Sequence, residues 1–219
     1  MRNDMALRSI ILDFDGVIIE SVDIKTRAFR ELFREYPEHV DEIAQYHLKN
    51  GGMSRFKKFS YIYENILKQP LDEVKMKELG EAFSKIVRSE MISCPFVVGA
   101  EDFMEKYSER TMLFIASGTP EDELREIVLE RGISRFFRGI FGTPRTKSDI
   151  ILGILEEFDL DKEEVFFVGD SFNDYEGARI AGVPFISRIS GHDPRMKGLG
   201  FASVRDLSEL DILLEGSGL

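Results

Sequence analysis

Four short apolar runs, each ending in Gly, Ser or Asp, most constrain the fold of this 219-residue chain. Runs of this length and character are typical of parallel strands that are buried on both faces. Helical patterns over 120–130 and 148–158 separate the later runs. The alternation predicts a doubly wound α/β parallel sheet, Rossmann-like, with right-handed crossovers. The expected strands span residues 8–14, 111–117, 164–170 and 183–187.

Residues 22–92 have a different pattern, because no strand-like run occurs in them. Apolar residues there recur at helical spacing, as at Phe29 and Phe33. Pro95 breaks the helix that precedes it. We therefore predict an all-helical domain at 22–92, inserted into an α/β core made of residues 1–21 and 93–219.

The charge of the chain is unevenly distributed. The net charge of −11 argues against a nucleic-acid partner, which needs a basic face. The predicted insertion has 13 Lys and Arg against 12 Asp and Glu, which leaves 16 against 28 elsewhere, so the insertion carries +1 and the remainder −12. Within it, residues 49–58 contain four cations and no acid. This run is either a solvated helix face or an anion site.

Other classes of protein are disfavoured by what the chain lacks. It has no stretch of about 20 apolar residues that would span a membrane, and its N-terminus is charged where a signal peptide would be apolar. We expect a soluble, cytoplasmic protein with no membrane partner, as a monomer or a weak dimer. Cys94 is the single cysteine, so a disulfide framework is excluded and a metal would be held by oxygens.

Polar residues stand where the predicted strands end. In an open α/β sheet, ligands bind beyond the carboxyl ends of the strands. Four carboxylates gathered there would repel one another unless a cation lay among them, and hard oxygen ligands suit Mg²⁺. The candidate residues at this edge are Asp13, Asp15, Ser117, Asp170 and Asp174, together with Lys147 at the start of a predicted helix.

These residues lie in four motifs that occur in a fixed order. They are DFDGV (13–17), SGT (117–119), Lys147 and GDSFND (169–174). In this order they resemble the motifs of the haloacid dehalogenase-like hydrolase superfamily. With a helical insertion after the first strand, the chain is most similar to the branch of phosphoglycolate phosphatases and β-phosphoglucomutases, in which the insertion is a cap domain.

The resemblance implies a role for each acid. Asp13 would be the nucleophile that accepts the phosphoryl group as an aspartyl-phosphate, and Asp15 the general acid and base, which needs a raised pKa. Mg²⁺ would be held by Asp13, the backbone carbonyl of Asp15 and Asp170. Asp174 would bind the ion directly or orient its waters.

The remaining motif residues would bind the substrate. Ser117, Gly118 and Lys147 would contact the phosphoryl oxygens. In the cap, GMSR (52–55) resembles the loop that carries a substrate-binding arginine in β-phosphoglucomutases, so Arg55 is a candidate contact for an anionic substrate. Lys25, also a candidate contact, stands where those mutases have a histidine.

Taken together, the resemblance implies an Mg²⁺-dependent phosphatase of a small phosphorylated metabolite such as a sugar phosphate. Asp15 favours phosphoester chemistry, because dehalogenases lack an acid at that position. A phosphosugar mutase is the alternative, although Lys25 and the form of GDSFND favour the phosphatase. A receiver-like phospho-switch is more remote, because receivers place their acid pair and their phosphorylated aspartate on different strands.

Each residue also has an ordinary structural interpretation. Thr119, followed by Pro120, has the pattern of a helix N-cap, which leaves Ser117 available for another role. Asp170 or Ser171 could cap the following helix, and Lys147 alone would be read as a surface lysine. We assign the histidines and Cys94 to structure or surface, and Gly118, Gly139 and Gly142 to turns.

Overall fold

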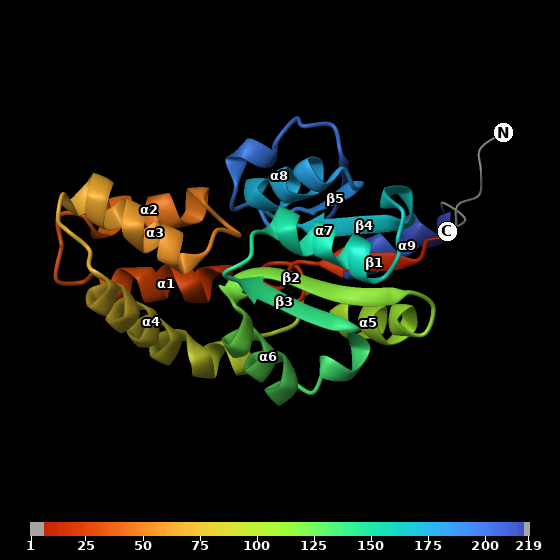
Figure 1. Ribbon diagram of the computed structural model, residues 1–219, viewed down its shortest axis with the longest axis horizontal. Coiled ribbons are helices and arrows are strands. Elements are labelled where there is room, and N and C mark those ends of the chain that lie inside the picture. The colour runs from red at the N-terminus through yellow and green to blue at the C-terminus, as the bar shows by residue number, and fades with distance from the viewer. Residues whose placement is uncertain (1–6, 217–219) are drawn as a thin grey trace.

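The computed structural model describes residues 7–216 and contains one parallel sheet of six strands. The strand order is β3-β2-β1-β4-β5-β6, the doubly wound arrangement that the sequence predicts. Figure 1 shows the sheet with helices on both faces and a separate group of helices beyond one end. The strands are β1 (Ser9–Leu12), β2 (Met112–Pro120), β3 (Gly139–Thr143), β4 (Val165–Gly169), β5 (Phe185–Arg188) and β6 (Ala202–Val204).

The helices divide into two sets. One set follows β1 directly and contains no strand: α1 (Val22–Leu32), α2 (Val40–Lys49), α3 (Arg55–Tyr61), the π-helix η1 (Ile62–Leu67) and α4 (Glu73–Ser93). This is the helical cap. The other set belongs to the core: α5 (Ala100–Ser108), α6 (Glu121–Glu130), α7 (Lys147–Glu157), α8 (Phe172–Ala181) and α9 (Leu207–Gly216). Within 7–216, no helix has both the length and the apolar character needed to cross a bilayer.

The side chains of β1 alternate between two apolar layers. Ile10 and Leu12 pack into the layer under α5, α6 and α9, whereas Ile11 packs into the layer under α7 and α8. All three side chains are fully buried. A strand covered on both faces must be continuously apolar, which explains why the sequence pattern is a run rather than an alternation.

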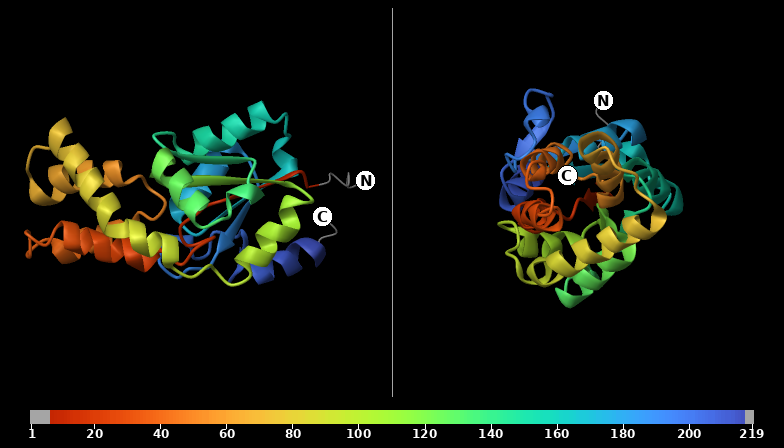
Figure 2. Two further views of the ribbon diagram at one scale, coloured as in Figure 1. Left: turned by 90° about the horizontal axis from the view of Figure 1, so that it is seen from below. Right: turned by 90° about the vertical axis from the view of Figure 1, so that its left-hand side faces the viewer.

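Aromatic rings hold the cap together. Phe29 on α1 stacks on His47 of α2, with ring centroids 4.4 Å apart, and meets Phe83 of α4 edge-on at 5.0 Å. Phe59 of α3 lies 5.7 Å from the same ring. Phe29 is therefore the point at which the four cap helices meet. Figure 2 shows these helices as a group that extends away from the sheet.

Two strands and three glycines differ from the sequence-based prediction. The four expected runs correspond to β1, β2, β4 and β5, but β3 and β6 were not expected. Gly118, Gly139 and Gly142 were assigned to turns, and this was wrong: Gly118 lies in β2, and the other two lie in β3. β3 is an edge strand rich in glycine, so its sequence resembles a loop more than a strand.

The topology fixes where polar residues can gather. β1 lies between β2 and β4, and the chain winds outward from it in both directions. Leu12, the last residue of β1, is paired with Ile115 on one side and Val168 on the other. The residues that follow β1 and β4 therefore emerge side by side at the switch point of the sheet, where open α/β folds bind ligands.

Replacing Phe29 with Ala should lower the free energy of unfolding by about 3–5 kcal/mol, because the cavity would open where all four cap helices meet. Urea unfolding followed by circular dichroism measures this change. Leu129→Ala, at a side chain 67% exposed, is the control and should change stability by less than about 0.5 kcal/mol. Equal losses in the two variants would contradict this account of the cap.

Candidate active site

Three buried carboxylates meet at the switch point of the sheet. Asp13 follows β1, Asp170 follows β4, and Asp174 lies in the first turn of α8. Each offers one oxygen to a group whose members all lie within 4.8 Å of one another. The backbone N–H of Asp13 donates to the carbonyl of Val168 at 2.9 Å, which ties the end of β1 to β4. The structure thus brings together three of the four acids that the sequence singled out.

Two glycines make this close approach possible. Gly16 has a φ of +74°, and a Cβ added there would lie 2.2 Å from Oδ2 of Asp170. A Cβ on Gly169 would lie 2.2 Å from Cβ of Asp174. Any side chain at either position would push the acids apart, which is the physical reason for a glycine beside each acidic pair.

Ser171 is the N-cap of α8, as one of the ordinary interpretations proposed. Its backbone N–H donates to Oδ2 of Asp174 at 3.0 Å, and its hydroxyl also donates to that oxygen. This capping box fixes the carboxylate of Asp174 at the start of the helix.

Among residues 7–216, Lys147 is the cation that pairs with the acid group, and it contacts two of the three acids. Its Nζ lies 2.9 Å from Oδ2 of Asp13 and forms an ion pair with Asp174. Its side chain is only 6% exposed, so the interpretation as a surface lysine was wrong. Gly177 of α8 allows this burial, because a Cβ there would lie 2.9 Å from Cβ of Lys147.

The electrostatics of the group favour a bound cation. Burial, and then the charge of Asp174, raise the pKa of Asp13 well above its ordinary value. The same two causes raise the pKa of Asp170 to about 7. Oδ2 of Asp13 faces Lys147 as an ion pair but receives no hydrogen bond. Three buried carboxylates that share one lysine fit a hard divalent cation such as Mg²⁺.

Asp15 has a different environment. Its carboxylate accepts a hydrogen bond from Ser21 Oγ at 2.6 Å and forms an ion pair with Lys25. Burial alone would raise its pKa, but Lys25 and the hydrogen bonds from Lys25 and Ser21 outweigh burial, so the pKa of Asp15 is lowered. The expected raised pKa is therefore not found in this state of the site. The side chain of Asp15 is not part of the three-acid group.

Thr119 also belongs to this environment, which corrects its assignment as a helix cap. Pro120 is the N-cap residue of α6. The hydroxyl of Thr119 accepts from Lys25 Nζ at 2.9 Å and lies 3.3 Å from Oδ2 of Asp15, to which it donates. Side chains two residues apart on a strand point to the same face, so the motif SGT could have suggested that Thr119 joins Ser117 at the site.

Ser117 and Gly118 lie where the core meets the cap. The hydroxyl of Ser117 is buried and accepts the backbone N–H of Thr119 at 3.1 Å. A Cβ on Gly118 would lie 2.5 Å from the carbonyl oxygen of Gly52, so glycine is required for the cap loop to approach β2. Ser117 and Lys147 line a hollow that adjoins the pocket described next and shares Gly52, Met53 and Gly118 with it.

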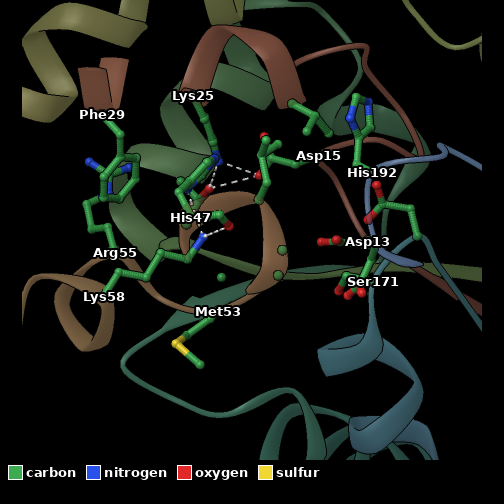
Figure 3. A pocket seen from close by; sticks show the side chains of 18 of the residues that line it. Asp13, Asp15, Lys25, Phe29, His47, Met53, Arg55, Lys58, Ser171 and His192 are labelled. Atoms are coloured by element: carbon green, nitrogen blue, oxygen red, sulfur yellow. Dashed lines mark hydrogen bonds and ion pairs between the residues drawn. The ribbon is translucent and has the colours of Figure 1, made fainter. Parts of the chain in front are cut away.

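A pocket with a cavity of about 60 Å³ lies between the cap and the acids. Asp13, Asp15 and Asp170 line its core side, together with His192 and Asp193. Figure 3 shows Lys25 pointing toward Asp15 and the side chain of Lys58 extending into the pocket beside His47. The cap side is lined by Lys25, His47, Arg55 and Lys58, together with apolar residues and glycines.

Arg55 reaches this pocket, but its guanidinium is already paired. Its Nη2 lies 2.6 Å from Oε1 of Glu123 on α6, and its Nη1 donates to Oε2 of Glu123 at 3.0 Å and to Ser84 Oγ at 2.7 Å. Arg55 is 5% exposed and joins the cap to the core. A substrate anion would have to compete with Glu123 for this guanidinium, so substrate binding by Arg55 stays a prediction.

Several residues of the site gave no usable signal in the sequence. Ser21 donates to Asp15, His47 lines the pocket, and Glu123 pairs with Arg55. His47 was assigned to structure or surface, yet it lines the pocket. Lys58 was noted only as part of a basic run, and burial distinguishes it from its exposed neighbour Lys57.

Glu123→Gln should destabilise the protein at neutral pH by about 3 kcal/mol, because the buried Arg55 would lose its partner. Burial alone would raise the pKa of Glu123. The charge of Arg55 and the hydrogen bonds from Arg55 and Ser84 outweigh burial and lower this pKa from its ordinary 4.5. The ionised carboxylate thus stabilises the fold above pH 4.5, and this contribution is lost as the pH falls through the lowered pKa. The difference in the free energy of unfolding between wild type and variant should therefore become smaller below about pH 4.5.

Urea unfolding at pH 7 and at pH values below 4.5 measures this gap. Glu126→Gln is the matched control, because Glu126 lies one turn further along α6 and pairs with Arg88 at the surface. It should leave stability almost unchanged at every pH. A gap for Glu123→Gln that did not vary with pH would contradict the assignment.

Comparisons with known proteins agree with this geometry. A family model described as haloacid dehalogenase-like hydrolase matches residues 10–187. No curated protein matches the chain.

Solved structures share the fold at low sequence identity. CbbY from Rhodobacter sphaeroides, in complex with xylulose-(1,5)bisphosphate, is 18% identical with a TM-score of 0.75, over 93% of this chain and 96% of that one. A haloacid dehalogenase-like family hydrolase from Streptococcus pneumoniae is 18% identical with a TM-score of 0.71, over 94% and 98%. The HAD-hydrolase YfnB from Bacillus subtilis, bound to magnesium, is 19% identical with a TM-score of 0.71, over 96% and 99%. Because the family model covers most of its length, and the fold and the acid group agree with it, this chain belongs to the haloacid dehalogenase-like hydrolases.

Proposed function

We propose that this enzyme is an Mg²⁺-dependent phosphatase that hydrolyses a small phosphorylated metabolite through an aspartyl-phosphate on Asp13. The observation that carries the proposal is the meeting of Asp13, Asp170 and Asp174 with Lys147 at the switch point of the sheet. Neighbouring structures with bound magnesium and with a bound bisphosphate support it.

Asp13 would act as the nucleophile in the first step. An oxygen of its carboxylate forms a bond to phosphorus while the bond from phosphorus to the ester oxygen breaks. Lys147 is positioned to neutralise charge on the phosphoryl oxygens, because it already contacts Asp13. Ser117 and the backbone at Gly118 would complete the phosphoryl-binding surface.

Asp15 would move the proton in both steps. Protonated Asp15 gives its proton to the departing alkoxide, and the resulting carboxylate then takes a proton from the water that attacks phosphorus. The bond between phosphorus and Asp13 breaks in that second step and releases phosphate. The ion pair with Lys25 favours the ionised form of Asp15, which suits the second step.

Magnesium would neutralise the charge of the transferred phosphoryl group when bound. Asp13 and Asp170 are the residues best placed to hold it, and the backbone carbonyl of Asp15 is a further candidate. Asp174 has a donor at each oxygen, Lys147 at one and Ser171 at the other. We therefore expect Asp174 to orient Lys147 and the waters of the ion more than to bind the ion itself.

The helical segment 22–92 would serve as the cap that closes over the substrate and excludes water. The phosphatase is favoured over a phosphosugar mutase because the Lys25 ammonium, in place of an imidazole, contacts Asp15 directly. A receiver-like phospho-switch would be phosphorylated once and would not turn over.

Asp13→Asn should abolish hydrolysis of p-nitrophenyl phosphate, because an amide cannot act as the nucleophile. Release of p-nitrophenol by wild type over many turnovers is the measurement. Asp122→Asn, at an exposed acid on α6, is the control and should retain full activity. A single stoichiometric phosphorylation of wild type without further turnover would instead indicate the switch.

Magnesium binding can be tested without turnover. Millimolar Mg²⁺ should raise the melting temperature of wild type, because a cation that binds only the folded state stabilises it and relieves the repulsion among the acids. Asp170→Asn should weaken this response, and removal of the ion with EDTA should reverse it. Differential scanning fluorimetry measures both, and an unchanged Mg²⁺ response in Asp170→Asn would count against the assigned ligands.

A further inference from the structure

The hollow that adjoins the pocket reaches the residues proposed to bind the phosphoryl group. Ser117 and Lys147 line the hollow and are not among the residues that line the pocket. The reverse holds for Asp13, Asp15 and Asp170, which line the pocket alone. A phosphoryl group bound by Lys147 and facing Asp13 would therefore lie between the two spaces, with the nucleophile on the side of the pocket.

The hollow runs from a buried end to an exposed one. Ser117 and Lys147 are buried at its inner end. Its lining also includes Arg145 and Thr146, which are exposed, and Ile180, which is 59% exposed. The hollow has a volume of about 450 Å³, against about 60 Å³ for the cavity of the pocket. A small solute beside Lys147 therefore has more room on the side of the hollow, and that space extends to the surface.

Glycine keeps the inner end of the hollow open where the cap loop meets β2. Gly52 and Gly118 line both the hollow and the pocket. Gly52 has a φ of +69°, and a Cβ added there would lie 3.2 Å from Nζ of Lys147 and 2.6 Å from Oγ of Ser171. A side chain at position 52 would therefore fill the space beside the lysine that is proposed to hold the phosphoryl group.

The charges of the hollow suit an anion better than those of the pocket. Three cations line the hollow, Lys57, Arg145 and Lys147, and among the described residues of its lining Glu176 is the only acid. The pocket is lined by three cations and four acids. Helix α7 also begins at the hollow, and the N-terminus of a helix attracts negative charge. An anion released between the two spaces is therefore drawn toward the hollow.

The second step of the reaction produces such an anion. Inorganic phosphate forms when water breaks the bond between phosphorus and Asp13, and it remains beside Lys147 until it leaves. A path through the pocket would take this anion across a space lined by Asp15 and Asp193, which would repel it. A path through the hollow would take it past the hydroxyl of Ser148, which can donate a hydrogen bond to it.

We propose that inorganic phosphate leaves the enzyme through this hollow, so that the phosphate and the alcohol depart by separate openings and the cap stays in place during phosphate release. This inference rests on the proposed phosphatase function. A block in the hollow should slow the entry and the exit of phosphate by the same factor and leave its Kd unchanged, because Kd is the ratio of the two rate constants.

The test places a removable block in the hollow. Ser148→Cys, modified with benzyl methanethiosulfonate, carries a bulky group at a position that lines the hollow, and dithiothreitol removes that group. Leu152→Cys is the matched control, because Leu152 lies one turn further along α7, is 42% exposed and is not part of the lining. The buried native cysteine, Cys94, is present in both variants.

Turnover of p-nitrophenyl phosphate gives the first readout. Modified Ser148→Cys should form its first p-nitrophenol as fast as the unmodified variant and then turn over about tenfold or more slowly, because phosphate release limits the later turnovers. Stopped-flow absorbance would show this as a burst, which dithiothreitol should abolish and modified Leu152→Cys should lack. Turnover that is unaffected by the block, or a first turnover slowed as much as the later ones, would overturn the inference.

Exchange of inorganic phosphate separates this inference from the proposed function. In the presence of Mg²⁺, phosphorus NMR measures how fast phosphate leaves, and calorimetry measures its Kd, both without turnover. Modification of Ser148→Cys should slow dissociation by about tenfold or more at an unchanged Kd. If wild type is a phosphatase but the block produces neither the burst nor slower exchange, the inference is overturned and the function stands. If nothing is hydrolysed but the block slows exchange at an unchanged Kd, the route stands and the function fails.

Discussion

The repulsion among three buried carboxylates is the constraint on which the rest of the site depends. Two like charges 4 Å apart repel by about 4 kcal/mol even at an effective dielectric constant of 20. Oxygens of Asp13, Asp170 and Asp174 all lie within 4.8 Å of one another, and within residues 7–216 Lys147 is the cation that pairs with them. Such an arrangement persists only if the surrounding fold imposes it and a cation or proton offsets it. Burial, together with this repulsion, raises the pKa values of Asp13 and Asp170.

The fold holds the three carboxylates close together through backbone geometry more than through side-chain contacts. Parallel pairing of β1 with β4 places Asp13 and Asp170 beside each other. Glycines at 16 and 169 remove the side chains that would separate the acids. The capping box of α8 then fixes Asp174 from the other side. Each element serves an ordinary structural purpose, and together they concentrate negative charge at one point.

The sequence predicted the sheet, the insertion and the acid group because those features depend on local pattern. Buried parallel strands are recognisable as apolar runs, and their ends must meet at one edge, so Asp13 and Asp170 could be placed together before any coordinates. β3 was not predicted, because Gly139 and Gly142 give this edge strand the composition of a loop. Thr119 was misassigned because a Thr-Pro pair fits a helix cap as well as a strand end.

The environment of the cap residues could not be predicted, because it depends on contacts between distant segments. Lys57 and Lys58 are adjacent lysines that the sequence does not distinguish, yet α3 exposes the first and buries the second. From the sequence, Arg55 resembles an arginine that binds substrate. The structure shows that its guanidinium is already paired with Glu123, 68 residues further along the chain. Likewise, nothing local to Asp15 indicates that Lys25 lowers its pKa.

Several contacts between the cap and the core hold the cap over the pocket. Arg55 joins α3 to α6 through Glu123, and Arg88 of α4 pairs with Glu126 and Glu130 at the surface of the same helix. Arg55 of the buried pair lines the pocket, whereas the exposed pairs of Arg88 are not part of its lining. Loss of one partner from the buried pair therefore costs more than loss of a surface pair. The close approach of Gly52 to Gly118 brings the cap loop against β2 at the same pocket. Both contacts join the cap to the core beside the pocket, so the position of the cap and the shape of the pocket depend on the same residues.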